Sequence, residues 1–154
     1  MLLHHEIELQ AARTPNAIAV TCADKSITYA ELDMYANRCA RYLRELGIGP
    51  DVIIGVLMER SLELVVGLLG ILKAGGAYLP LDPRYPEERL NFILADADVP
   101  VVITLASLAS RTDSFDGTVL TLDLEDGVLP EYNGSPLEGE NTPDDLAYVI
   151  YTSG

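Results

Sequence analysis

The residues best suited to chemistry stand at the end of the chain, in the order Thr152, Ser153 and Gly154. They follow a short apolar run, residues 146–150, which predicts a buried strand. The two hydroxyl groups can donate hydrogen bonds to an anion, and the glycine lets backbone N–H groups approach it closely. Such a loop after a strand is typical of phosphate binding.

Other reactive side chains lack the spacing that catalysis or metal binding needs. His4 and His5 are adjacent, whereas two histidines that bind one metal ion from a single helix are typically four residues apart. We therefore expect no metal site here, and we expect these residues to lie in an exposed N-terminal segment. Cys22 and Cys39 form no Cys-x-x-Cys pattern and indicate ordinary reduced thiols. We therefore assign no catalytic residue and no metal ligand in this span. Acidic pairs of a kind common on protein surfaces occur at Asp96/Asp98 and Asp144/Asp145.

Composition and charge exclude several classes of protein. The chain has 154 residues, of which 49% are hydrophobic, so it can build a core. Ten basic against 24 acidic residues give a net charge of −14, which argues against nucleic-acid binding. Residues 96–154 hold 12 of the acidic residues and one basic residue, Arg111. The sequence shows neither an export signal nor an apolar run long enough to cross a membrane, which favours a cytoplasmic protein.

Hydrophobic periodicity predicts helices alternating with strands. Thr28 and Glu31 form a capping-box pattern ahead of the first long helix. Ser61 is suited to cap a second helix that runs to Lys73. This helix is apolar nearly all round and carries Gly67 and Gly70, which predicts burial and close packing.

The remaining elements complete an α/β pattern. Pro86 suits the first position of a third helix, and the acidic stretch 123–145, rich in Pro, Gly and Asn, predicts an exposed loop. The order of strands and helices predicts a parallel sheet with right-handed crossovers. Strands are predicted within 18–28, as two short ones, and at 52–57, 77–81, 100–103, 118–122 and 146–150.

Three motifs in order give the chain a resemblance to a known family. Residues 27–32 read ITYAEL, residues 72–82 read LKAGGAYLPLD, and residues 146–154 read LAYVIYTSG. They resemble the first three core motifs of the adenylation domain of a nonribosomal peptide synthetase, in the adenylate-forming, AMP-binding enzyme superfamily. The resemblance covers essentially the whole chain, and Ile27 stands where the family usually has leucine.

The resemblance also implies a fold and a domain division. The chain is expected to be the N-terminal part of the large subdomain, an α/β unit with an incomplete, doubly wound, mainly parallel sheet. Residues 1–17 are then an N-terminal linker or helix, and residues 18–154 the first part of the adenylation domain. Because the family's third motif continues after Gly154, we expect this span alone to be inactive. We also expect marginal stability of the span alone, because the strand at 146–150 would leave apolar surface and an unpaired sheet edge.

The activity that the resemblance implies is amino-acid activation. Such domains use ATP with Mg²⁺ to form an aminoacyl-adenylate and pyrophosphate, and then load the acyl group onto the phosphopantetheine thiol of a carrier-protein domain. A condensation domain often precedes them. By the same resemblance, Thr152, Ser153 and Gly154 belong to the ATP phosphate loop. Structural roles are expected for the other motif residues, Thr28, Tyr29, Glu31, Lys73, Gly75, Gly76, Pro80 and Asp82.

Two alternatives stay open. An acyl-CoA or aryl-acid ligase of the same superfamily would share the phosphate loop, although LKAGGAYLPLD favours the peptide-synthetase branch. A truncated, non-catalytic interaction module is the other alternative, and its only support is the acidic half of the chain.

Overall fold

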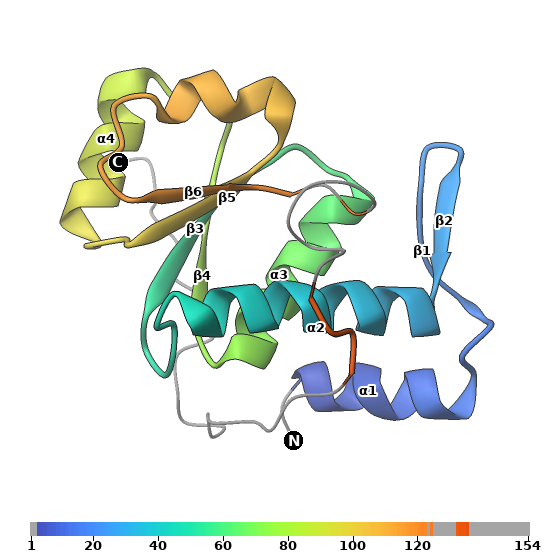
Figure 1. The fold of residues 1–154 in the computed structure, drawn as a ribbon. Helices are drawn as coiled ribbons and strands as arrows, with labels where there is room; N and C mark the ends of the chain where they lie inside the picture. The colour runs from blue at the N-terminus through green and yellow to red at the C-terminus, as the bar shows by residue number, and fades with distance from the viewer. Residues whose placement is uncertain (1–2, 123, 125–131, 136–154) are drawn as a thin grey trace.

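The computed structural model describes residues 3–122, 124 and 132–135 of the chain, and it contains a parallel sheet with helices on both faces (Figure 1). No helix in the described part of the chain combines the length and apolarity needed to span a membrane. The elements are α1 (Leu3–Arg13), β1 (Ile18–Cys22), β2 (Lys25–Thr28), α2 (Tyr29–Glu45), β3 (Ile53–Leu57), α3 (Leu62–Ala74), β4 (Ala77–Leu81), α4 (Glu87–Asp96), β5 (Val101–Thr104), the 3₁₀ helix η1 (Ala106–Thr112) and β6 (Thr118–Thr121).

The main sheet has the strand order β4-β3-β5-β6, and all of its neighbouring strands are parallel. This confirms the parallel α/β fold class expected from the sequence. The strands β1 and β2 pair antiparallel as a separate hairpin, which stands apart from the main sheet in Figure 1. The strand expected at 146–150 lies outside the described residues.

Successive side chains of a strand point to opposite faces of the sheet, so the core is divided between the two faces. Ile54 and Val56 of β3 belong to the cluster that also contains buried residues of α2 and α3. Leu57 of β3 and Val102 of β5 belong to a second cluster, which contains the buried residues of α4. Helices therefore cover both faces, as the doubly wound class requires.

The helix α3 packs closely against its neighbours, as its apolar sequence predicts. Val66, Ile71 and Ala74 are fully buried. Gly70 faces α2 at Cys39. Ser61 caps the helix, because its hydroxyl accepts a hydrogen bond from Leu64 N at 3.1 Å.

Two local expectations need correction. Pro86 is the N-cap of α4 rather than its first helical residue, since the helix begins at Glu87. The helix η1 was not predicted, because its sequence, ASLASRT, has no apolar periodicity. It occupies the connection between β5 and β6.

Candidate functional site

The carboxyl ends of the four parallel strands meet at one edge of the main sheet. Open α/β sheets bind their ligands outside this edge, because the following loops and helix N-termini converge there. The residues that directly follow the strands β3, β4, β5 and β6 are Met58, Asp82, Leu105 and Leu122.

The predicted phosphate-binding residues Thr152, Ser153 and Gly154 lie outside the described residues. Their role in phosphate binding therefore stays a prediction.

The two central strands are tied together at this edge by a buried hydrogen bond. Thr104 Oγ1, fully buried at the end of β5, donates to the carbonyl oxygen of Leu57 at the end of β3, at 2.7 Å. A buried, satisfied hydroxyl of this kind aligns the strand ends and leaves no polar group unpaired. The exposed residues Glu59 and Arg60 follow β3 closely in the chain.

Asp82 forms a charged turn where β4 ends. Both of its carboxylate oxygens accept hydrogen bonds from the Arg84 side chain, and Oδ1 also accepts from Arg84 N at 2.9 Å. The side-chain bonds first, and then the backbone bond, lower the pKa of Asp82 to about 2. The carboxylate is therefore ionised at neutral pH and shapes the turn before α4.

Arg111 secures the same turn from η1. Its guanidinium donates hydrogen bonds to the carbonyl oxygens of Pro83 and Tyr85. The sequence did mark Arg111 as unusual, because it is the one basic residue within residues 96–154. Its role in holding the β4–α4 turn was nevertheless missed, since both acceptors are backbone atoms that no residue type identifies.

The first motif builds the start of α2. Thr28 Oγ1 accepts from Glu31 N at 3.1 Å, and Glu31 Oε1 accepts from Thr28 N at 2.9 Å, so the predicted capping box is present. Tyr29 lines an apolar hollow of about 230 Å³ together with residues of α1, β1 and α3.

The second motif ends α3 and forms β4. Gly75 caps the helix with a positive φ of 95°, which a residue with a side chain adopts only under strain. A Cβ at Gly76 would lie 2.9 Å from Ile54 Cδ1 and 3.1 Å from the Val52 carbonyl oxygen, so a side chain there would force its neighbours to shift. Pro80 is exposed on β4, an edge strand of the main sheet, where its missing N–H is tolerated.

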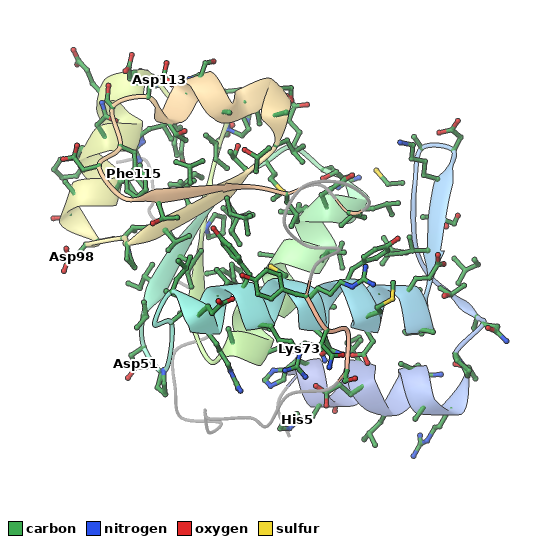
Figure 2. All side chains as sticks on the ribbon, in the orientation of Figure 1. His5, Asp51, Lys73, Asp98, Asp113 and Phe115 are labelled. Atoms are coloured by element: carbon green, nitrogen blue, oxygen red, sulfur yellow. The ribbon has the colours of Figure 1, made fainter. Side chains whose placement is uncertain are left out.

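Lys73, also from the second motif, is held between three helices. Its side chain is only 2% exposed, and Nζ lies 2.7 Å from Glu8 Oε1 of α1 and 2.7 Å from Asp33 Oδ1 of α2. Arg44 Nη2 donates to the Lys73 carbonyl oxygen at 3.1 Å. Figure 2 shows Lys73 in the space between α1 and α2. One ammonium therefore joins α1, α2 and α3.

His4 is buried, which corrects the expectation of an exposed N-terminal segment. The residue is 3% exposed, because α1 packs against α2 and α3 and turns this side chain inward. His5 is only partly buried. Burial first, and then the nearby His5, lower the pKa of His4 to about 4. The imidazole is therefore neutral at pH 7.

The depressed pKa of His4 predicts a loss of stability in mild acid. The unfolded chain binds the proton near pH 6.5 and the folded chain only near pH 4, so acidification between these values favours unfolding. We expect the free energy of unfolding to fall by about 1–3 kcal/mol from pH 7 to pH 4.5 through this group. Urea unfolding of the H4L variant should show a flatter pH profile, and H5Q is the matched control. Identical profiles for wild type and H4L would contradict the assignment.

The remaining reactive candidates form no site in the described part of the chain. Burial raises the pKa of the Cys39 thiol to about 12, so this cysteine is inert at neutral pH. Among residues 3–122, 124 and 132–135, no three His, Cys, Asp or Glu side chains gather as a metal site.

Two hollows lie at the amino-terminal edge of the main sheet, opposite the strand ends described above. One of about 440 Å³ is lined by Asp51, Asp98 and Pro100, among others. Another of about 260 Å³ lies beside Phe115, between α4 and the segment before β6. Figure 2 labels Asp51, Asp98 and Phe115 around this edge. Their position is not the one at which parallel sheets bind nucleotides.

The chain is similar in sequence to a known enzyme family and to several synthases. A family described as AMP-binding enzyme matches residues 7–154. A subunit of the mycosubtilin synthase of Bacillus subtilis is 48% identical over 152 residues, which is 99% of this chain and 6% of that protein. Zwittermicin A synthase ZmaJ of Bacillus cereus is 47% identical over 148 residues, which is 96% of this chain and 28% of that protein.

Solved structures agree with the sequence comparison. The nonribosomal peptide synthetase FmoA3, in an AMPPNP-bound form, superimposes with a TM-score of 0.92 and 40% identity, over 99% of this chain and 16% of that one. A fatty acyl CoA synthetase of Mycobacterium tuberculosis superimposes with a TM-score of 0.87 and 27% identity, over 97% and 32%. The chain thus spans less than a third of each of these proteins.

Proposed function

The chain belongs to the AMP-binding enzyme family, and on that premise we propose that it is part of an amino-acid-activating adenylation domain in nonribosomal peptide synthesis. The observation that carries the proposal is 48% identity to a peptide synthetase across 99% of the chain. The fold supports it, because 99% of the chain superimposes on a nonribosomal peptide synthetase with a TM-score of 0.92.

The reaction proposed is the ATP-dependent formation of an aminoacyl-adenylate, followed by transfer of the acyl group to a carrier-bound phosphopantetheine thiol. In this reaction the amino-acid carboxylate attacks the α-phosphorus of ATP, and pyrophosphate leaves. The carrier thiol then takes the acyl group, and AMP leaves. Mg²⁺ would neutralise charge on the ATP phosphates. Thr152, Ser153 and Gly154 are proposed to bind the phosphates through hydroxyl and backbone N–H groups. Carrier and condensation domains are the proposed partners in the parent protein.

The described residues are proposed to act indirectly, by holding the sheet and its turns. The Thr104–Leu57 hydrogen bond aligns the carboxyl ends of β3 and β5, and Arg111 holds the turn after β4. The residues of the first two motifs build helix ends, a strand and the Lys73 contacts, so we propose structural roles for them.

An acyl-CoA ligase is the second candidate, favoured by the superposition on a fatty acyl CoA synthetase. Its identity of 27% is well below the 40–48% shared with peptide synthetases. Amino acids are therefore the substrate class that we propose first.

The proposal is tested by amino-acid-dependent exchange of pyrophosphate into ATP, measured on the protein that carries this chain. A panel of amino acids should include at least one that stimulates exchange well above background, whereas fatty and aryl acids should not. The S153A and T152A variants should each lower kcat/KM for ATP about 10- to 100-fold, because each removes a hydrogen bond to a charged group.

The matched control is S110A, which alters an exposed serine of η1. It should leave exchange unchanged. Stimulation by fatty acids alone would replace the proposal with the acyl-CoA ligase. Undiminished exchange in both S153A and T152A would refute the phosphate-loop assignment.

A further inference from the structure

A continuous series of polar contacts runs from α1 to residues 132–135, a segment that lies on α2. Glu8 Oε1 contacts Lys73 Nζ at 2.7 Å, and Lys73 Nζ contacts Asp33 Oδ1 at 2.7 Å. The other oxygen of Asp33 accepts from Asn37 Nδ2 at 3.4 Å, and the same amide donates to the carbonyl oxygen of Gly134 at 2.9 Å. One series of polar contacts therefore joins α1, α2 and α3 to a segment that lies 97 residues beyond Asn37 in the sequence.

The middle of this series is largely shielded from water. The Lys73 side chain is 2% exposed, Asn37 is 0% exposed, and the Asp33 side chain is 17% exposed. Where water cannot replace a lost partner, buried polar groups depend on each other more strongly than exposed ones. Loss of a contact at one end of the series therefore weakens the contacts of the neighbouring side chain.

The segment 132–135 contacts α2 through backbone carbonyl groups and through an aromatic ring. Arg41 Nη2 donates to the Ser135 carbonyl oxygen at 2.9 Å, and the rings of Tyr42 and Tyr132 meet edge to face, with centroids 5.7 Å apart. A Cβ at Gly134 would lie 2.6 Å from Met34 Cγ, so the segment approaches the helix closely. The Asn37 amide is the contact that links this segment to Lys73.

We propose that Lys73 couples the docking of α1 to the docking of residues 132–135 on α2. When the Glu8 carboxylate moves away from Lys73, Asp33 is the carboxylate that still balances the ammonium. Both oxygens of Asp33 then turn toward Lys73 Nζ. Asp33 Oδ2 then moves away from Asn37, and the amide loses the partner that orients it toward Gly134. Because coupling between two sites is reciprocal, release of residues 132–135 weakens the hold on α1 by the same factor. The coupling is independent of the chemistry proposed above.

Hydrogen exchange read by mass spectrometry on the intact protein tests the coupling. The E8Q variant weakens one end, and the readout is the exchange of backbone amides at residues 132–135. We expect exchange there to rise about fivefold or more, together with exchange in α1, because typical couplings begin at that size. The matched control is E6Q, which neutralises an exposed glutamate on the same helix and should change neither.

Two further readouts decide the outcome. In an N37L background, where the series is cut between Asp33 and Gly134, E8Q should have no additional effect on residues 132–135. Should N37L fail to fold, the comparison of E8Q with E6Q stands by itself. Faster exchange in E8Q that is confined to α1 would overturn the coupling. A uniform rise that includes α4 and the β1–β2 hairpin would also overturn it, because it would indicate global destabilisation.

Discussion

Replacing Lys73 with methionine should lower the free energy of unfolding by about 3–5 kcal/mol. Methionine matches the length of the aliphatic stem but leaves Glu8 and Asp33 facing each other without the ammonium between them. Both carboxylates are only partly exposed, at 29% and 17% of their side chains, so water screens their repulsion incompletely. Urea unfolding at pH 7 measures the change.

The chain supplies a matched control, because its other lysine, Lys25, is exposed on β2. The K25M variant should change the free energy of unfolding by less than about 0.5 kcal/mol. The triple variant K73M/E8Q/D33N should recover much of the loss, since it also removes the two unpaired carboxylates. A change below about 1 kcal/mol in K73M would show that Lys73 is not held as the structure indicates.

Adding a single methyl group at Gly70 should also destabilise the protein, by up to about 2 kcal/mol. A Cβ there would lie 2.7 Å from both Cβ and Sγ of Cys39, so α2 and α3 would have to move apart. Overpacking of this kind costs about 1–3 kcal/mol, and the better helix propensity of alanine offsets about 1 kcal/mol of it. Thermal and urea unfolding of G70A measure the balance.

Gly67 is the matched control for this substitution, because it stands on the same helix one turn earlier. Its Cβ would meet only side-chain atoms at ordinary contact distances, the nearest being those of Leu122 and Met58 at 3.7 Å. G67A should therefore be neutral or stabilising by up to about 1 kcal/mol. Equal effects of the two substitutions would contradict the difference in packing that separates the two glycines.

Local sequence predicted those features of the fold that depend on neighbouring residues. The capping box at Thr28 and Glu31 needs only two residues three apart, and it is present as predicted. The strand β3 was predicted as a buried parallel strand, because a run that is apolar on both faces suits a covered sheet. The family followed from motifs that are themselves local patterns.

The partners of Lys73 could not be read from the sequence. A lone lysine in the apolar run LLGILKAGG signals a need for neutralising charge, but 24 acidic residues were available. Glu8 and Asp33 are the partners of Lys73 because the packing of α1 and α2 against α3 places their carboxylates beside its ammonium. The burial of His4 has the same origin, since it follows from the docking of α1 and not from any local pattern.

The sequence by itself determined the order of β1 to β6 and of α2 to α4, the capping box at Thr28 and Glu31, and the family, because these rest on periodicity and on short fixed motifs. It determined neither η1 nor the N-cap position of Pro86. Tertiary structure alone decided which distant groups meet: Lys73 with Glu8 and Asp33, Asn37 with Gly134, and Arg111 with the turn after β4. The physical reason is that a buried polar group must find some partner, whereas the identity of that partner depends on how whole helices and strands pack.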